Sequence, residues 1–158
     1  MLGMAIWAEA GANQPSTLGD QRMGETLCTL APSLLNHAAG KVKRRSRHVG
    51  RLSWSKRHAL RKSLKKLCFD VESLAGLYAP LAVKTYSRRC EALEKILGVA
   101  NDAVVTKRLA LSLVSAGRPD LAKPAGAVIR WNERRARKAL QGLKPALKEY
   151  RAVPVFWS

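Results

Sequence analysis

Three observations predict an all-α protein, an antiparallel bundle of about four to five helices. Apolar residues recur three and four positions apart through most of the chain after residue 26, which is the period of an amphipathic helix. No alternation of apolar and polar residues persists for the length of a strand. Glycine and proline divide the helical pattern into segments with short connections. We therefore expect one helical domain over residues 26–158.

Residues 1–25 contain four glycines and Pro15 and show little periodicity. Glycine and proline are typical of turns and irregular backbone. We expect this segment to be irregular, apart from a short helix near Met4–Ala10.

Helix boundaries follow from capping residues, glycines and prolines. Five helices are expected, over about residues 27–49, 54–78, 83–97, 104–116 and 126–143. Pro32 is compatible with the first turn of the first helix, and Ser53 or Ser55 can cap the second. Gly98 is expected to end the third helix, with Asn101 or Asp102 at the start of the fourth. Pro145 should bend or divide the end of the last.

The composition indicates an acidic partner. The chain has 158 residues and a formal net charge of +18, whereas its hydrophobic content of 47% is ordinary for a globular protein. Such a charge predicts salt-sensitive attraction to nucleic acid, polyphosphate or an acidic membrane surface. No apolar run is long enough to span a membrane. The three widely spaced cysteines fit neither a disulfide framework nor a zinc site, so we expect a reducing cytoplasm.

The second expected helix separates apolar from basic residues. Its apolar stripe consists of Leu60, Leu64, Leu67, Val71 and Leu74. The opposite face carries His58, Arg61, Lys62, Lys65, Phe69 and Glu72, also three and four positions apart. Twelve lysines and arginines and no carboxylate lie between Lys41 and Lys66. A face that serves only solubility normally carries both signs of charge, so this pattern favours a polyanion site over a merely solvated surface.

Motifs for catalysis are missing from the sequence. It contains no glycine-rich phosphate loop, no Gly-x-Ser-x-Gly and no His-Glu-x-x-His. The eleven carboxylates are not spaced as a metal-binding cluster. Cys68 falls near the basic face, but a catalytic cysteine is the weaker interpretation. We expect a protein without catalytic residues, cofactor or metal, and therefore not an enzyme.

Three separated segments resemble the CHAD family, the conserved histidine α-helical domain. They are His58-x-x-Arg61-Lys62-x-x-Lys65-Lys66-Leu67-x-Phe69-x-x-Glu72, then Leu97-Gly98-x-x-Asn101-Asp102, and finally Pro154-Val155-Phe156-Trp157. The resemblance covers roughly residue 30 to the C-terminus. Cys68 and Phe69 depart from the family pattern, in which arginine and tyrosine are usual.

The resemblance implies a function and an incomplete architecture. CHAD proteins are associated with inorganic polyphosphate and its granules, and some are fused to a triphosphate-processing CYTH domain. The family domain resembles two helical halves that face each other across a basic channel. Here one His-containing basic helix is evident, and it matches the second, C-terminal half. The alternatives for such a half-domain are a truncated remnant, a partner of a separate CHAD half, and a homodimer.

We therefore expect non-enzymatic binding of inorganic polyphosphate, with cytoplasmic or granule localisation. The predicted ligand-binding residues are His58, Arg61, Lys62, Lys65, Lys66, Lys41, Arg44, Arg45, His48, Arg134, Arg135 and Lys138. Glu72 and Asp102 are expected to orient these cations, although Asp102 is equally suited to a helix cap. His58 has two interpretations, as a phosphate contact or as a structural group at a helix start.

Nucleic-acid binding is the main alternative, and an accessory role beside a triphosphate- or polyphosphate-processing enzyme is the other. Trp54 and Trp131 could stack on bases, but only nine aromatic residues are present. We expect both tryptophans to lie at the edge of the core.

Overall fold

The computed structural model describes the backbone of residues 17–158 and the side chains from residue 26 onward. Within this range it contains five α-helices and three short 3-10 helices, which confirms the predicted all-α class. The α-helices are α1 (Thr17–Arg45), α2 (Trp54–Ser73), α3 (Pro80–Ser115), α4 (Ala122–Gln141) and α5 (Leu143–Ala152). The 3-10 helices are Val49–Arg51, Ala75–Leu77 and Pro119–Leu121. The short helix expected near Met4–Ala10 lies outside the described residues.

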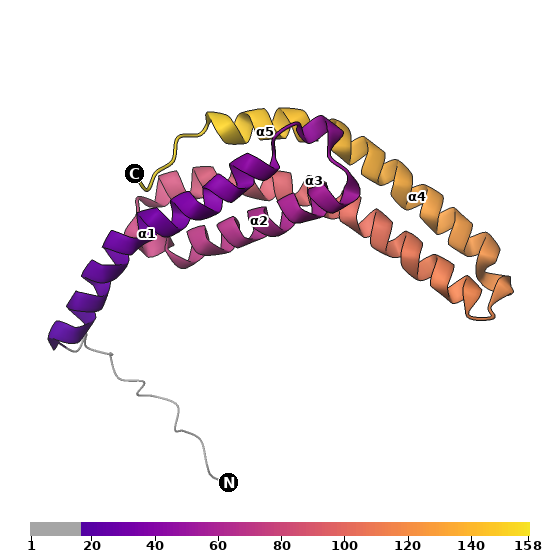
Figure 1. The fold of residues 1–158 in the computed structure, drawn as a ribbon, viewed down its shortest axis with the longest axis horizontal. Coiled ribbons are helices and arrows are strands. Elements are labelled where there is room, and N and C mark those ends of the chain that lie inside the picture. Colours follow the sequence, from indigo (N-terminus) through magenta and orange to yellow (C-terminus); the bar gives the residue numbers. More distant parts are fainter. Residues whose placement is uncertain (1–16) are drawn as a thin grey trace, which may run out of the picture.

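The helices form a bundle from which one hairpin projects (Figure 1). α1 packs on α2, α2 packs on the first half of α3, and α5 covers α3 beside the α1–α2 connection. The second half of α3 pairs with α4 and extends beyond the end of the bundle. The core therefore forms where α1, α2, α3 and α5 meet.

The apolar stripe of α2 lies in that core, as predicted. Leu60, Leu64, Leu67 and Val71 are at most 3% exposed, and Leu74 is half-buried at the helix end. α2 ends at Ser73, five residues earlier than expected, because a 3-10 turn intervenes before Pro80. Of the basic face of α2, Lys62 and Lys65 are exposed, whereas His58 and Arg61 are half-buried.

α1 begins earlier than expected and contains Pro32 in its interior. Gly19 and Gly24 each weaken a helix by about 1 kcal/mol without preventing it, so the glycine content wrongly suggested an irregular segment up to residue 25. Proline removes one helical hydrogen bond, a cost that packing can offset. Ala31 and Leu35 on either side of Pro32 are fully buried.

The apolar positions of α1 also differ from the expectation. Leu27 and Leu34 are 46% and 55% exposed, although their spacing from Ala31 and Ala38 predicts one common apolar side of the helix. The first turns of α1 project past the end of α2 (Figure 1). Further along α1, Ala31, Leu35, Ala38 and Val42 form the buried side of the helix.

The third and fourth expected helices are one continuous helix, α3. Gly98, Asn101 and Asp102 lie inside it, so the predicted stop and caps at these residues are wrong. A glycine costs a helix about 1 kcal/mol, which tertiary packing readily outweighs. Leu97 and Ala100 beside Gly98 are buried, so the packed face continues through this point without interruption. The predicted division near Pro145 is observed, between α4 and α5.

The C-terminal residues complete the core. Trp157 is 2% exposed, and its Nε1 donates to Asn36 Oδ1 on α1 at 3.0 Å. The rings of Tyr86 and Phe156 pack edge-on against it, with centroids 4.9 and 4.8 Å away. Tyr86 and Tyr150 share a buried hydrogen bond of 2.7 Å between their hydroxyl groups. This aromatic cluster joins α1, α3 and α5 to the end of the chain.

Tyrosine ionisation should report on this cluster. Burial raises the pKa of Tyr150 to about 12, and burial also raises the pKa of Tyr86 and of Tyr78. In the unfolded chain these groups ionise near 10. Their contribution to stability is therefore complete below pH 10 and is lost as the pH rises towards 12. We expect tyrosinate absorbance at 295 nm to appear near pH 10 in denaturant but clearly later in the folded protein. Coincident titrations would contradict the buried pair.

Candidate functional site

α2 carries the predicted basic face on its solvent side. The helix starts at a serine cap, because Ser53 Oγ accepts a hydrogen bond of 3.4 Å from the backbone N–H of Lys56. Lys62 and Lys65 are exposed, whereas His58 and Arg61 are half-buried. The apolar stripe thus orients two lysines towards solvent and turns the histidine and arginine towards α3.

The two central segments of the sequence pattern meet across the α2–α3 contact. His58 Nδ1 lies 3.0 Å from Asn101 Oδ1. Arg61 passes over Gly98, where a Cβ atom would lie 4.0 Å from its Nε. Arg61 follows His58 by three residues on α2, and Gly98 precedes Asn101 by three residues on α3. Because the two helices are antiparallel, His58 lies opposite Asn101 and Arg61 lies opposite Gly98. Asn101 therefore positions the histidine, and Arg61 lies in ordinary van der Waals reach of position 98.

The partner of His58 determines how the ring can meet an anion. The Asn101 oxygen only accepts hydrogen bonds, so in this arrangement the Nδ1 atom of His58 carries the proton. In the neutral ring Nε2 is then an acceptor and cannot donate to a phosphate oxygen. The contact with Asn101 therefore fixes the tautomer of the neutral His58 ring.

Trp54 extends the same contact towards the start of α2. Its ring stacks on His58 with centroids 5.5 Å apart, and the Arg108 guanidinium lies 4.4 Å from the Trp54 ring centre. Trp54 is half-buried, which agrees with its expected place at the edge of the core. Trp54 Nε1 and Arg61 Nε are buried N–H groups without an acceptor. The α2–α3 contact thus leaves two buried N–H donors without a partner among the described residues.

A groove between α1 and α2 collects four of the predicted residues, and we call it the interhelical groove. It has a volume of about 470 Å³, and its charged lining comprises Lys41, Arg45, Lys62, Lys66 and Asp70, with His37 beside them. Arg45 donates to the carbonyl of Ala59 at 3.0 Å and to Ser63 Oγ, which fixes its guanidinium on α2. Asp70 pairs with Lys66 at 2.9 Å. Lys41 and Lys62 form none of the ion pairs found in residues 17–158.

A second basic hollow lies where α1 ends, and we call it the corner hollow. It has a volume of about 540 Å³ and is lined by Arg44, Arg45, Arg47, His48, Arg51, Leu52, Lys56 and Ala59. Arg44, Arg45 and His48 were predicted as site residues. Arg47, Arg51 and Lys56 were not, because they fall at the α1–α2 connection, where helical spacing no longer relates one side chain to another. The acid-free stretch of sequence was the one available signal for them.

The two carboxylates expected to orient the cations have no such contacts. Glu72 and Asp102 are both exposed, and neither takes part in the ion pairs of residues 17–158. The residue that holds His58 is Asn101, an uncharged neighbour of Asp102. Orientation of this site therefore depends on an amide and on helix packing.

The predicted cations of α4 lie apart from the interhelical groove. Arg134, Arg135 and Lys138 are exposed on a helix whose main packing partner is α3. Figure 1 shows α4 running away from α1 and α2 along the projecting hairpin. Trp131 is 52% exposed beside them, with the Arg135 guanidinium 4.7 Å from its ring centre, so its expected place at the edge of the core is wrong.

Cys68 is buried and not on the basic face. It forms a hydrogen bond with Cys90, and this bond, together with burial, raises the pKa of Cys90. A thiol that remains protonated is a poor nucleophile. Among the described side chains, those of residues 26–158, no three of the potentially metal-binding His, Cys, Asp and Glu types come together.

Comparison with known proteins identifies the family. Within the described part of the chain, no helix is both long and apolar enough to cross a bilayer. Neither a curated protein nor a solved structure matches the chain. The sequence model of the CHAD domain matches residues 1–111. This range begins closer to the N-terminus than the resemblance described above, and it does not include the Pro154–Trp157 ending. The matched range contains α1, α2, most of α3 and the His58–Asn101 and Arg61–Gly98 pairs, and the chain therefore belongs to the CHAD domain family.

Proposed function

We propose that this protein binds inorganic polyphosphate without catalysing a reaction on it. The interhelical groove is the observation that carries the proposal. Lysines and arginines from two helices line it together, and its single carboxylate, Asp70, is already paired with Lys66. Membership of the CHAD family supports the same ligand, and localisation to polyphosphate granules is part of the proposal.

Polyphosphate suits this surface better than duplex DNA does. A flexible phosphate chain needs cations at repeated intervals, whereas DNA needs an element shaped to its grooves. Lys62 lines the interhelical groove and Lys65 is exposed three residues further along α2, so both can meet phosphate oxygens. Arg45 is held on α2 by its hydrogen bonds to Ala59 and Ser63, so less side-chain entropy is lost when it binds.

Binding should be sensitive to salt and independent of divalent metal. A polyanion that replaces counterions loses affinity steeply with salt, by about a thousandfold between 50 and 200 mM for six contacts with DNA. Fluorescence anisotropy of end-labelled long-chain polyphosphate, titrated with protein at several salt concentrations, measures this dependence. Addition of EDTA should leave the affinity unchanged. An affinity that stays constant over this range of salt would contradict the proposal.

Nucleic-acid binding is the second candidate, and the outer face of α4 favours it. Trp131 and Arg135 form an exposed stacked pair next to Arg134 and Lys138. Such aromatic and basic surfaces stack on unpaired bases. Competition between long-chain polyphosphate and single-stranded DNA for the purified protein separates the two candidates. Preferential retention of DNA, lost on Trp131→Ala substitution, would favour the second.

We also propose that two copies associate weakly. Leu27, Leu30 and Leu34 form an exposed apolar stripe on α1, with each side chain 46–55% exposed. Exposed apolar surface favours association, whereas the net charge of +18 opposes it. A polyphosphate chain that bridges two copies should therefore raise the dimer fraction. Light scattering with and without tripolyphosphate, at several protein concentrations, tests this. A monomer under all conditions would rule out self-association.

A further inference from the structure

A third basic hollow lies between α5 and the α1–α2 connection, and we call it the α5 hollow. Its volume is about 610 Å³. It is lined by His48, Val49, Gly50, Arg51, Lys144, Leu147, Lys148 and Arg151. The three cations of α5 recur four and three residues apart, beside the buried residues Leu143, Leu147 and Tyr150. Their common side of the helix follows from that spacing.

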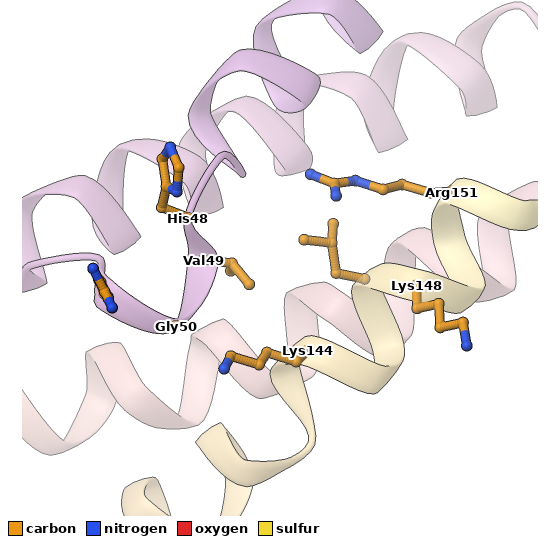
Figure 2. Close-up of a pocket in the computed structure, with 8 residues that line it drawn as sticks. His48, Val49, Gly50, Lys144, Lys148 and Arg151 are labelled. Carbon is orange, nitrogen blue, oxygen red and sulfur yellow. The ribbon is translucent and has the colours of Figure 1, made fainter.

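Hydrogen bonds hold one cation of the α5 hollow, Arg151, in place. Figure 2 shows Arg151 and Lys144 reaching from α5 towards the α1–α2 connection, whereas the Lys148 amine turns to the outer side of α5. Arg151 Nη2 donates to Ser46 Oγ at 3.0 Å and to the Ser46 carbonyl at 3.3 Å. Lys144 crosses Gly50 so closely that a Cβ atom there would lie 2.4 Å from its Cε. Gly50 is therefore required for this position of Lys144.

The charges of the α5 hollow are not neutralised within the described residues. Arg51, Lys144, Lys148 and Arg151 take part in none of the four ion pairs there. The nearest carboxylate in sequence, that of Glu149, is paired with Arg89 of α3. His48 adds a titratable ring, held at a φ of 53°, which is uncommon for a residue other than glycine. Cations gathered without counter-charge repel one another, and an anion would relieve that repulsion.

The three basic hollows are connected by shared residues. Arg45 lines both the interhelical groove and the corner hollow. His48 and Arg51 line both the corner hollow and the α5 hollow. A continuous basic surface therefore passes from the space between α1 and α2, around the end of α1, onto α5.

We infer that a single polyphosphate chain follows this surface through all three hollows, so that the protein selects long chains over short ones. The inference rests on the proposed function and adds a path and a length preference to it. On α5 alone, Lys144 and Arg151 are about 10 Å apart along the helix axis. A short oligophosphate fills one hollow, whereas a long chain gains the contacts of all three through one binding event.

The test uses the double variant Lys144→Glu/Lys148→Glu in the full chain. Both lysines are exposed, and circular dichroism checks that helix content is retained. Lys84→Glu/Arg88→Glu is the matched control, since it makes the same change in net charge at two exposed positions of α3. Where the glutamate variant loses helix content, Lys144→Gln/Lys148→Gln replaces it, with the corresponding Lys84→Gln/Arg88→Gln control.

Long-chain polyphosphate and tripolyphosphate are the two probes. We expect the α5 variant to lose about tenfold or more in affinity for the long chain and the control to lose clearly less. The slope of log K against log salt should become less steep by about 1.4 for the α5 variant, because each of two lost contacts contributes about 0.7. The slope should stay unchanged for the control. The wild-type preference for the long chain over tripolyphosphate should shrink in the α5 variant.

Three outcomes separate the inference from the function on which it rests. Equal losses in the α5 variant and the control, with unchanged salt slopes, would overturn the path while leaving polyphosphate binding intact. Failure of the wild-type protein to bind long-chain polyphosphate would overturn both. Binding by the wild type with no preference for long chains would overturn the length selection.

Discussion

Replacing Lys62 and Lys65 together by glutamate should lower the affinity for long-chain polyphosphate by at least about a hundredfold. Each lysine that contacts phosphate contributes about 1.5–3 kcal/mol, and the new carboxylates repel the chain. Both side chains are exposed on the outer side of α2, opposite the buried Leu60–Leu64 stripe, so the fold should be retained. Anisotropy titrations at a fixed salt concentration measure the loss.

The control for this variant is the same charge change on another helix. Lys84→Glu/Arg88→Glu also lowers the net charge by four, at exposed positions of α3. If a long-range field alone attracts the ligand, both variants should weaken binding equally. A much larger loss from the α2 variant would localise the contact to α2 and its groove.

Trp157→Ala should be among the most destabilising single substitutions in this protein. Removing a buried tryptophan typically costs about 3–5 kcal/mol, because the space is only partly refilled. Trp157 is 2% exposed and packs against Tyr86 and Phe156. For a chain of this size such a loss lowers the melting temperature by about 10 °C or more. Thermal unfolding followed by circular dichroism measures the shift.

Trp131→Ala provides the comparison for tryptophan loss at the surface. Trp131 is 52% exposed, and its main contact is with Arg135 of the same helix. Surface substitutions usually change stability by about 0.5 kcal/mol or less. Equal destabilisation by the two substitutions would mean that the C-terminal residues do not complete the core.

The part of the site that could be predicted consists of residues that lie close together in the sequence. The placement of Lys62 and Lys65 opposite Leu60 and Leu64 follows from helical spacing alone, because one helix turn relates all four side chains. The lysines and arginines of α5 obey the same rule. They were nevertheless missed, because Lys144, Lys148 and Arg151 are only three charges in a short helix, and their significance depends on Arg51 from a distant segment.

The sequence by itself determined the helical class, the buried stripe of α2, the basic character of its outer face and the family. Each of these depends on residue types and local periodicity. Only the tertiary structure decided that α3 continues through Gly98 and that His58 meets Asn101. It also decided that Arg134 and Arg135 lie apart from the interhelical groove, and that the three hollows join around the end of α1. These features arise from packing between helices distant in sequence, which outweighs a local preference of about 1 kcal/mol such as that of a helical glycine.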